Sequence, residues 1–275
     1  MAQTLRANEL LRSFSSSQNS NGEQIDLFSK HTPHITLFLA DFDLEIHNES
    51  GAEDNNESLA KLNATKVDSF LDTISKINFT NIVEGLDCTL SLSQTQSSID
   101  HHQYDSSNNR EKYYTINGAF TMLHVHNTPC LQALSHAVLD PIESFVKRPV
   151  QVPSWVASLK EPERSAAIYR SREYGSPNVL EGFVPHLTVG YDPSTTATTE
   201  RSAAAPAHID WRENVMDQWN QEFSMFDSCS SDLKGVAVGR NSIGGTVLAN
   251  SRMKYWNVKN DTIQNEVQAV QLVLG

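Results

Sequence analysis

Residues 184–190 read VPHLTVG and residues 32–38 read TPHITLF, so the pattern Pro-His-aliphatic-Thr-aliphatic occurs twice in the chain. Both copies alternate polar with aliphatic residues, which is the period of a half-buried β-strand. The histidine and threonine of each copy then share one face of a strand, while the aliphatic neighbours anchor the other face. The repeat therefore predicts two matching strands that each present an imidazole and a hydroxyl to one surface.

Strand and helix patterns alternate around both copies of the motif, but strands also occur in hairpin-like pairs. This mixture favours an α+β fold of two similar lobes over a doubly wound parallel sheet. Apolar spacing predicts helices over 59–77, 131–146 and 208–226, and shorter helices are expected over 5–14 and over 161–172, the latter closed by Gly175. Alternation predicts strands over 34–46, 82–92, 113–126, 184–191, 235–240, 246–250 and 267–274.

Polar stretches suggest how the chain is divided. Residues 1–24 are expected to be a flexible N-terminal segment with one short helix, and residues 25–275 to form a single bilobal domain. Ser- and Asn-rich stretches near 48–57 and 93–112 are expected to be insertions that loop out of this domain.

Composition limits the possible partners. The chain has 275 residues, 39% hydrophobic content and a formal charge of −12, so it is globular and repels long duplex nucleic acid. A small nucleotide or the end of an RNA remains compatible with it. No stretch is long enough to span a membrane, and the start of the chain has no apolar signal region. We expect a monomer.

Three widely spaced cysteines without a Cys-x-x-Cys pair indicate structural thiols in a reducing compartment. We therefore expect a location in the cytoplasm or the nucleus.

The residue types of the repeated motif suit phosphodiester cleavage. Histidine titrates near neutrality, so His34 and His186 can hold opposite protonation states and act as general base and general acid. The phosphoryl oxygens gain charge in this reaction, and the hydroxyls of Thr36 and Thr188 can donate hydrogen bonds to them. A single His-x-Thr is ordinary on a polar strand face, but two copies of a five-residue pattern are not expected by chance. This chemistry requires no metal and no cofactor.

The paired His-x-Thr strands resemble the hallmark of the 2H phosphoesterase superfamily, which includes 2′-5′ RNA ligase-like proteins and cyclic nucleotide phosphodiesterases. The resemblance implies a bilobal fold in which two pseudo-symmetric lobes with antiparallel sheets flank a central cleft. It also implies that His34 and His186 are the catalytic residues and that Thr36 and Thr188 bind phosphate. Such a phosphoric diester hydrolase would act on a 2′,3′-cyclic phosphate, a 2′-5′ linkage or a small cyclic nucleotide.

Two features depart from compact members of that superfamily. The two insertions separate the motifs more widely, and only a short predicted helix precedes the first motif, where the family usually has a strand and a helix. The resemblance covers residues 28–275 as a pattern of elements, with residue identity confined to the motifs.

Other residues are candidates for substrate contact. Arg170 and Arg172 form a local basic spot ahead of the second motif, and Tyr174 beside them can stack on a base. Tyr191 follows the second motif and is expected to flank the cleft. His124 and His126 share one face of a predicted strand.

Two alternatives stay open. A non-catalytic protein that binds nucleotides or RNA ends would use the same cleft without turnover. A metallohydrolase would use His124 and His126, with a third ligand from His101, His102 or Asp105.

Overall fold

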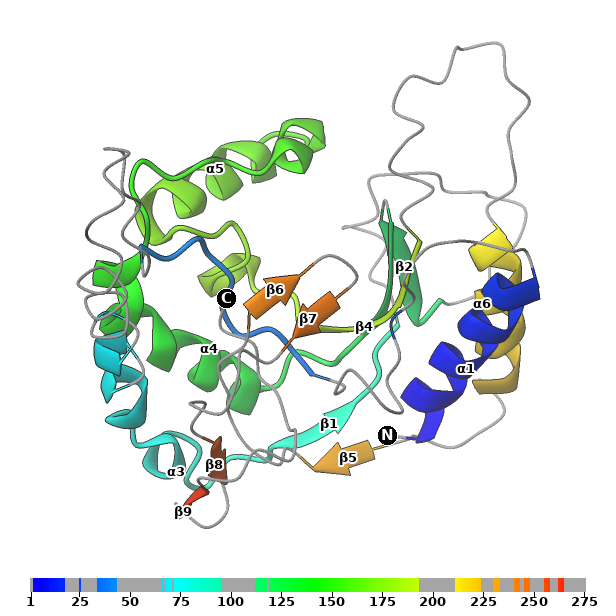
Figure 1. Ribbon diagram of the computed structural model, residues 1–275, viewed down its shortest axis with the longest axis horizontal. Coiled ribbons are helices and arrows are strands. Elements are labelled where there is room, and N and C mark those ends of the chain that lie inside the picture. The colour runs from blue at the N-terminus through cyan, green and yellow to red at the C-terminus, as the bar shows by residue number, and fades with distance from the viewer. Residues whose placement is uncertain are drawn as a thin grey trace, which may run out of the picture.

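The computed structural model describes residues 2–17, 25, 34–43, 66, 68–70, 72–94, 112–117, 119–192, 211–223, 230–232, 240–242, 245–247, 255–257 and 262–264. Helices and antiparallel strands are both present in these ranges, so the predicted α+β class is confirmed (Figure 1). The insertion predicted at 48–57, nearly all of the one at 93–112, and Cys229 lie outside the described residues.

The sheet that organises the fold has three antiparallel strands in the order β2-β3-β4. Strands β2 (Tyr114–Asn117) and β3 (Phe120–His124) form a hairpin, as predicted for 113–126. Strand β4 (His186–Tyr191) carries the second motif and pairs with β3, as predicted for 184–191.

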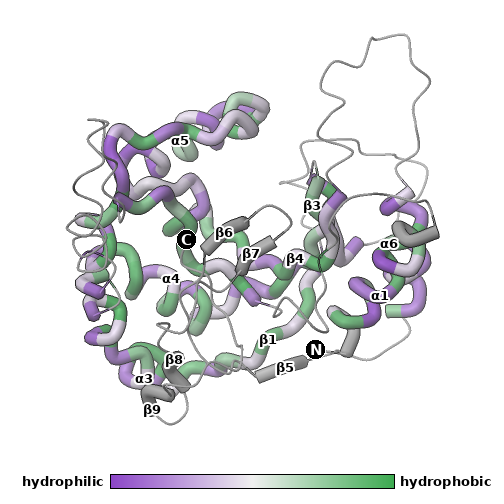
Figure 2. Tube along the Cα trace, in the orientation of Figure 1, coloured by the Kyte–Doolittle hydropathy of each residue, from purple (hydrophilic) through white to green (hydrophobic). Residues whose placement is uncertain are grey.

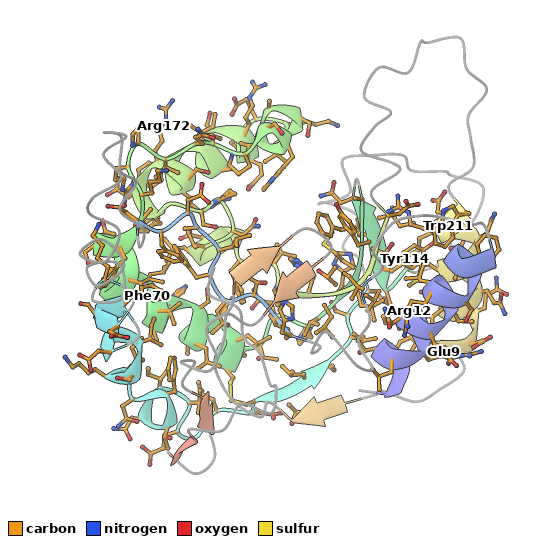
Figure 3. All side chains as sticks on the ribbon, in the orientation of Figure 1. Glu9, Arg12, Phe70, Tyr114, Arg172 and Trp211 are labelled. Carbon is orange, nitrogen blue, oxygen red and sulfur yellow. A yellow bond between two sulfur atoms is a disulfide. The ribbon has the colours of Figure 1, made fainter. Side chains whose placement is uncertain are left out.

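Helices α1 (Ala2–Ser17) and α6 (Trp211–Phe223) pack together and against one face of this sheet. Apolar and polar residues mix along both helices, as expected where only one side is buried (Figure 2). Tyr114, labelled in Figure 3, is buried on this face, and its hydroxyl donates to Asp217 Oδ1 at 2.5 Å. The core here consists of Ala7, Leu11, Ile25, Tyr114, Leu123, Val189, Val215, Met216, Trp219 and Phe223.

Helix α1 is also fastened to β4 by its side chains. Asn8 is fully buried, and its Nδ2 donates to the carbonyls of Val189 and Ile25, each at 2.8 Å. A Cβ on Gly190 would lie 2.7 Å from Leu11 Cδ1, so glycine permits this close approach. The helix is longer than the predicted 5–14, and this part of segment 1–24 packs into a core.

A second hydrophobic cluster lies around helix α4 (Pro129–Ile142), which continues into the 3-10 turn η2 (Glu143–Phe145). The helix begins where Thr128 Oγ1 accepts from the Leu131 backbone N–H at 3.3 Å. It packs with helix α3 (Phe79–Ile82), helical residues between 66 and 75, and the first motif segment. Ser135, fully buried, donates to the Leu37 carbonyl at 3.0 Å.

Residues 34–43 differ from the continuous strand predicted over 34–46. They make isolated antiparallel bridges, Ile35 with Leu187 and Phe42 with Val146. The backbone N–H of Asp43 donates to Phe145 O, and that of Lys147 donates to Asp41 O, both at 2.8 Å. The segment therefore pairs with several separate parts of the chain and is not a continuous strand.

Strand β1 (Thr89–Ser91) is shorter than the predicted 82–92, because α3 and a turn with Gly85 at φ 75° occupy the preceding residues. Helix α5 (Glu163–Tyr174) follows the 3-10 turn η3 (Ser154–Ser158) and ends at Gly175, whose φ of 87° suits glycine. The 3-10 turn η4 (Leu180–Gly182) precedes β4.

The remaining strands are short antiparallel pairs. They are β5 (Ser230–Asp232) with β1, β6 (Arg240–Ser242) with β7 (Gly245–Val247), and β8 (Tyr255–Asn257) with β9 (Thr262–Gln264). They overlap the strands predicted over 235–240 and 246–250 only in part.

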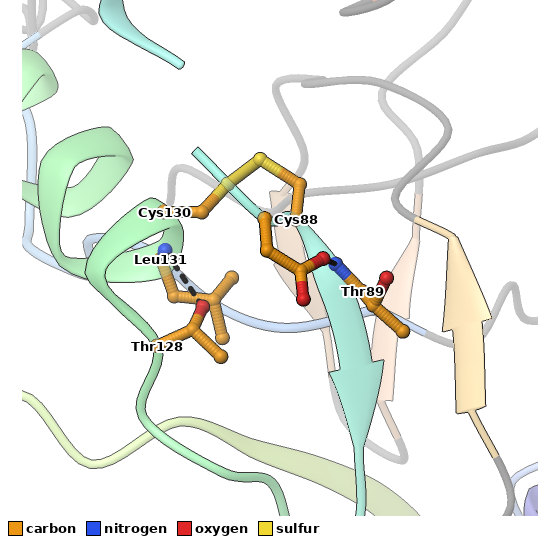
Figure 4. The surroundings of a disulfide bond; sticks show 6 residues. Cys88, Thr89, Thr128, Cys130 and Leu131 are labelled. Atoms are coloured by element: carbon orange, nitrogen blue, oxygen red, sulfur yellow. Dashed lines mark hydrogen bonds between the residues drawn. A yellow bond between two sulfur atoms is a disulfide. The ribbon is translucent and has the colours of Figure 1, made fainter. Parts of the chain in front are cut away.

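A disulfide joins Cys88, just before β1, to Cys130 in the first turn of α4, with the two Cα atoms 5.3 Å apart (Figure 4). The prediction of free structural thiols is therefore wrong for this pair. Because disulfides are typical of oxidising environments, the argument from cysteines for a cytoplasmic or nuclear location loses its support. Within the described ranges, no helix is both long and apolar enough to cross a membrane.

Candidate active site

The face of the sheet opposite α1 and α6 carries the candidate site. Along β3, Thr121 and Leu123 are buried on the helix side, whereas Phe120, Met122 and His124 alternate with them on the other side. We call this second side the front face. Thr115 on β2 and His186 and Thr188 on β4 are half-buried and share the front face by register.

Two histidines meet on the front face. His124 and His186 are directly opposite each other in the antiparallel pairing of β3 with β4. His124 Nε2 lies 2.5 Å from Thr115 Oγ1 on the neighbouring strand. Burial lowers the pKa of His124 to about 4, and the neighbouring His186 adds to this shift. His124 is therefore neutral at physiological pH.

The His186 ring is held in one tautomer. Its Nδ1 lies 3.0 Å from the Val184 carbonyl, which can only accept a hydrogen bond, so Nδ1 carries the proton. Burial lowers the pKa of His186, and the contact with Val184 opposes this only in part. A neutral ring with a proton on Nδ1 leaves the lone pair on Nε2, which is the state a general base requires.

The first motif lies beside the second. Ile35 and Leu187, the central aliphatic residues of the two motifs, form an antiparallel bridge on the edge of β4 that does not face β3. The two segments run in opposite directions. Antiparallel geometry therefore makes His34 the neighbour of Thr188, and Thr36 the neighbour of His186. His34 and Thr36 are half-buried, whereas Ile35 is 2% exposed. The structure thus makes the central residues of the two motifs neighbours, and antiparallel geometry predicts the positions of the four polar residues beside them.

An irregularity in β4 changes which residues reach the front face. Met122 pairs with Thr188, but Thr121 pairs with Gly190, so Val189 is an extra residue and forms a β-bulge. Val189 and Gly190 both face the buried side. Tyr191 is therefore opposite Phe120, with their ring centroids 5.1 Å apart, and it also packs against the cluster beneath α1 and α6.

The other predicted contact residues lie on or near α5. Arg170 is 6% exposed; its Nε donates to the Pro177 carbonyl and its Nη2 pairs with Glu163, both at 2.7 Å. Arg172 is exposed and lies on α5, away from the sheet in the view of Figure 3. Tyr174 packs against the α4 cluster, and burial raises the pKa of its hydroxyl. We leave these three residues out of the site.

His126 is exposed, and its backbone N–H donates to Ser91 O at 2.9 Å, beyond the end of β3. Among the residues that the structure describes, no three His, Cys, Asp or Glu side chains converge in a way that could hold a metal ion. His101, His102 and Asp105, the predicted third ligands, lie outside those residues.

Sequence reasoning missed three residues of the front face: Thr115, Phe120 and Met122. The available signal was the period-two alternation of residues 120–124, which places Phe120 and Met122 on the same face as His124. The contact of Thr115 with His124 depends on hairpin register and could not be read from spacing.

We compared the chain with protein-family models, with curated proteins and with solved structures, and none of the three comparisons gives a match. The resemblance to the 2H phosphoesterase superfamily therefore rests on the two sequence motifs.

Proposed function

We propose that this protein is a metal-independent phosphodiester hydrolase of the 2H phosphoesterase type, acting on a small nucleotide or an RNA end. The observation that carries the proposal is the antiparallel bridge between Ile35 and Leu187. Two segments far apart in the chain become neighbours at the central residue of each motif. Their polar residues then project to one face.

The arrangement suits a single phosphorus centre. In an antiparallel pair, diagonal neighbours on one face are about 7–8 Å apart, and His34 and His186 have this relationship. A phosphate between them can receive a hydrogen bond from a threonine on each side, because Thr188 is next to His34 and Thr36 is next to His186. These hydroxyls would stabilise the charge that develops on the phosphoryl oxygens.

We assign the base role to His186, since its Nδ1–H is committed to Val184 and burial favours its neutral form. His186 Nε2 takes a proton from water as the water oxygen bonds to phosphorus. His34, in its protonated form, gives a proton to the ribose oxygen as the phosphorus–oxygen bond breaks. One water is consumed, and proton exchange with solvent restores both histidines.

The bilobal arrangement of the superfamily is also part of the proposal. Two hydrophobic clusters, one around α4 and one beneath α1 and α6, are separate in the described residues, and Leu187 packs against both. Leu187 lies between the two polar residues of the second motif. The proposed site would therefore sit where two lobes meet.

Purified protein tests the proposal with 2′,3′-cyclic AMP and a 2′-5′-linked adenylate dimer in the presence of EDTA. His34→Ala and His186→Ala are each expected to lower kcat by about 10²–10⁴-fold. His136→Ala, an exposed histidine on α4, is the matched control and should keep full activity. Thr188→Val should lower kcat by about 10²-fold, and Thr188→Ser should restore most of it, because the hydroxyl is the active group.

Several outcomes would contradict the proposal. Wild-type protein that binds these nucleotides without turnover would support the non-catalytic alternative. Activity that EDTA abolishes and added Zn²⁺ restores would support the metallohydrolase alternative.

A further inference from the structure

The residues that lead into β4 are tied to the continuation of β3 by two hydrogen bonds. The Val125 backbone N–H donates to the Pro185 carbonyl, and the side-chain Nδ2 of Asn127 donates to the Phe183 carbonyl, both at 3.1 Å. We call residues 183–185 the approach segment. It ends immediately before the histidine of the second motif, so whatever holds this segment also bears on the proposed base.

Asn127 continues a pairing that the backbone alone cannot complete. Extended beyond its last pair, the register of β3 with β4 would place Val125 opposite Pro185, and two residues farther on Asn127 opposite Phe183. Proline has no N–H to give to β3. The Phe183 N–H donates to the Leu180 carbonyl in η4 at 3.1 Å, and so is also used elsewhere. The side-chain amide of Asn127 supplies a bond where the regular ladder ends.

Holding the carbonyls of Phe183 and Pro185 sets the direction of the carbonyl between them. Phe183 is extended, with φ −71° and ψ 110°, and Val184 is restricted to extended conformations because a proline follows it. Successive carbonyls of an extended chain point to opposite edges, so the Val184 carbonyl points away from β3. This is the oxygen that lies 3.0 Å from His186 Nδ1.

We propose that Asn127 is a positioning residue, whose amide holds the approach segment so that the Val184 carbonyl keeps the His186 imidazole in its Nδ1–H tautomer. This inference rests on the proposed function and adds to it a residue that acts through the base, without touching substrate. A ring with its proton on Nδ1 always presents the Nε2 lone pair to water. A ring that exchanges tautomers presents an N–H there for part of the time and cannot then accept a proton.

The exposure of Asn127 makes the proposal testable by substitution. Its side chain is exposed, whereas Phe183, whose carbonyl it binds, is buried. Replacing Asn127 therefore removes one hydrogen bond and opens no cavity in the core. Its variants are expected to fold, and a change in the site can be assigned to the lost bond.

Kinetic constants for 2′,3′-cyclic AMP in the presence of EDTA give the first test. Asn127→Ala is expected to lower kcat by about 3- to 10-fold, the effect of one hydrogen bond, with KM nearly unchanged. Asn127→Gln keeps an amide donor and should lower kcat less. Asn81→Ala, at an exposed asparagine on α3, is the matched control and should keep the wild-type constants.

The pH profile separates positioning of the ring from a general loss of activity. The bond to the Val184 carbonyl favours the protonated ring, and so raises the pKa of His186 against the effect of burial. Without that bond the pKa falls, so the acid limb of kcat/KM should have its midpoint at lower pH in Asn127→Ala than in wild type. The titratable neighbours of His186, which are His124 on β3 and His34 in the first motif, are the same in both proteins.

Histidine NMR reads the tautomer without turnover. In protein with ¹⁵N-labelled histidine, proton–nitrogen correlation spectra distinguish a ring protonated on Nδ1 from one protonated on Nε2, and the spectrum of His186→Ala assigns the signal. At a pH where the ring is neutral, wild type and Asn81→Ala should show the Nδ1–H form. Asn127→Ala should show a mixture of both tautomers.

The outcomes distinguish this inference from the proposed function. Turnover by wild type, with either kcat or the tautomer unchanged in Asn127→Ala, would overturn the positioning role and leave the hydrolase proposal in place. A tautomer that depends on Asn127, in a protein without turnover, would support the hold on the ring and overturn the hydrolase. A wild-type ring protonated on Nε2 would overturn the positioning role whether or not the protein turns over.

Discussion

His124 and His186 are direct partners across β3 and β4, so two imidazoles share one small area of the front face. The pairing disfavours simultaneous protonation, because like charges at this separation repel in a half-buried setting. This repulsion accounts for part of the low pKa of His124. It also links protonation of the two histidines to the stability of the sheet. His124 is thus part of the electrostatic environment of His186.

The first prediction concerns stability and pH. His124 takes up a proton near pH 6.5 in the unfolded chain but only near pH 4 in the folded protein. Its contribution to the free energy of unfolding is therefore complete above pH 6.5 and is lost as the pH falls toward 4. Between pH 7 and pH 5, the loss from this group should be roughly 2 kcal/mol. Urea unfolding of wild type and His124→Asn should show a smaller loss in the variant. His136→Asn, exposed on α4, should behave like wild type, and an equal loss in all three would contradict the prediction.

The second prediction concerns the rate. A base must be neutral to act, and burial lowers the pKa of His186 below its usual 6.5. The acid limb of kcat/KM for 2′,3′-cyclic AMP should therefore have its midpoint below pH 6.5. Activity should be lost only as pH falls through that lower pKa. A midpoint above pH 6.5 would argue against His186 as the base.

The disulfide gives a third prediction. Cys88 and Cys130 are 42 residues apart, and a crosslink over such a loop stabilises a protein by about 2–4 kcal/mol. Cys88→Ser/Cys130→Ser should lower the free energy of unfolding by this amount, measured in urea without reductant. Dithiothreitol should destabilise the wild type similarly and leave the double variant unchanged. Equal stability of the two proteins without reductant would show that the bridge does not form in solution.

Gly182 provides a fourth prediction. A Cβ at this position would lie 2.5 Å from the guanidinium of Arg170, which is held by Pro177 and Glu163 and cannot easily move. Gly182→Ala should therefore destabilise the protein by about 1–3 kcal/mol in thermal or urea unfolding.

Arg170→Gln removes most of the guanidinium that the methyl group of Gly182→Ala would contact. The double variant Gly182→Ala/Arg170→Gln should be more stable than the sum of the single changes implies. Strict additivity would mean that the two residues are not in contact.

Much of the fold followed from local signals. Helices α4, α5 and α6 and strand β4 were predicted close to their observed positions, and for α4, α6 and β4 the apolar period was the signal. The continuous strand predicted from residue 34 is wrong over 34–43, because these residues pair at separate points with Leu187, Phe145 and Lys147, and such partners leave no local trace in the sequence.

Part of the candidate site could likewise be predicted from local sequence signals, and part of it could not. The repeat itself nominates His34, Thr36, His186 and Thr188 as candidates, and alternation predicts that the histidine and threonine of each motif share a face. The pairing of His124 with His186 depends on the long-range register of β3 with β4, and the pairing of Tyr191 with Phe120 depends on one extra residue in β4. A bulge inserts no recognisable residue type, so a pattern of period two misses it. The Cys88–Cys130 bridge could not be predicted, because an odd number of widely spaced cysteines is typical of free thiols.

The attachment of α1 to β4 has a practical consequence for anyone who handles this protein. Asn8 donates a hydrogen bond to the Val189 carbonyl, and Leu11 packs against Gly190. Both contacts lie on the face of β4 opposite His186. Residues 2–17 therefore serve as scaffolding for the candidate catalytic strand. A purification tag fused at that end, or a shortened clone, would act directly on the rear support of the proposed catalytic centre.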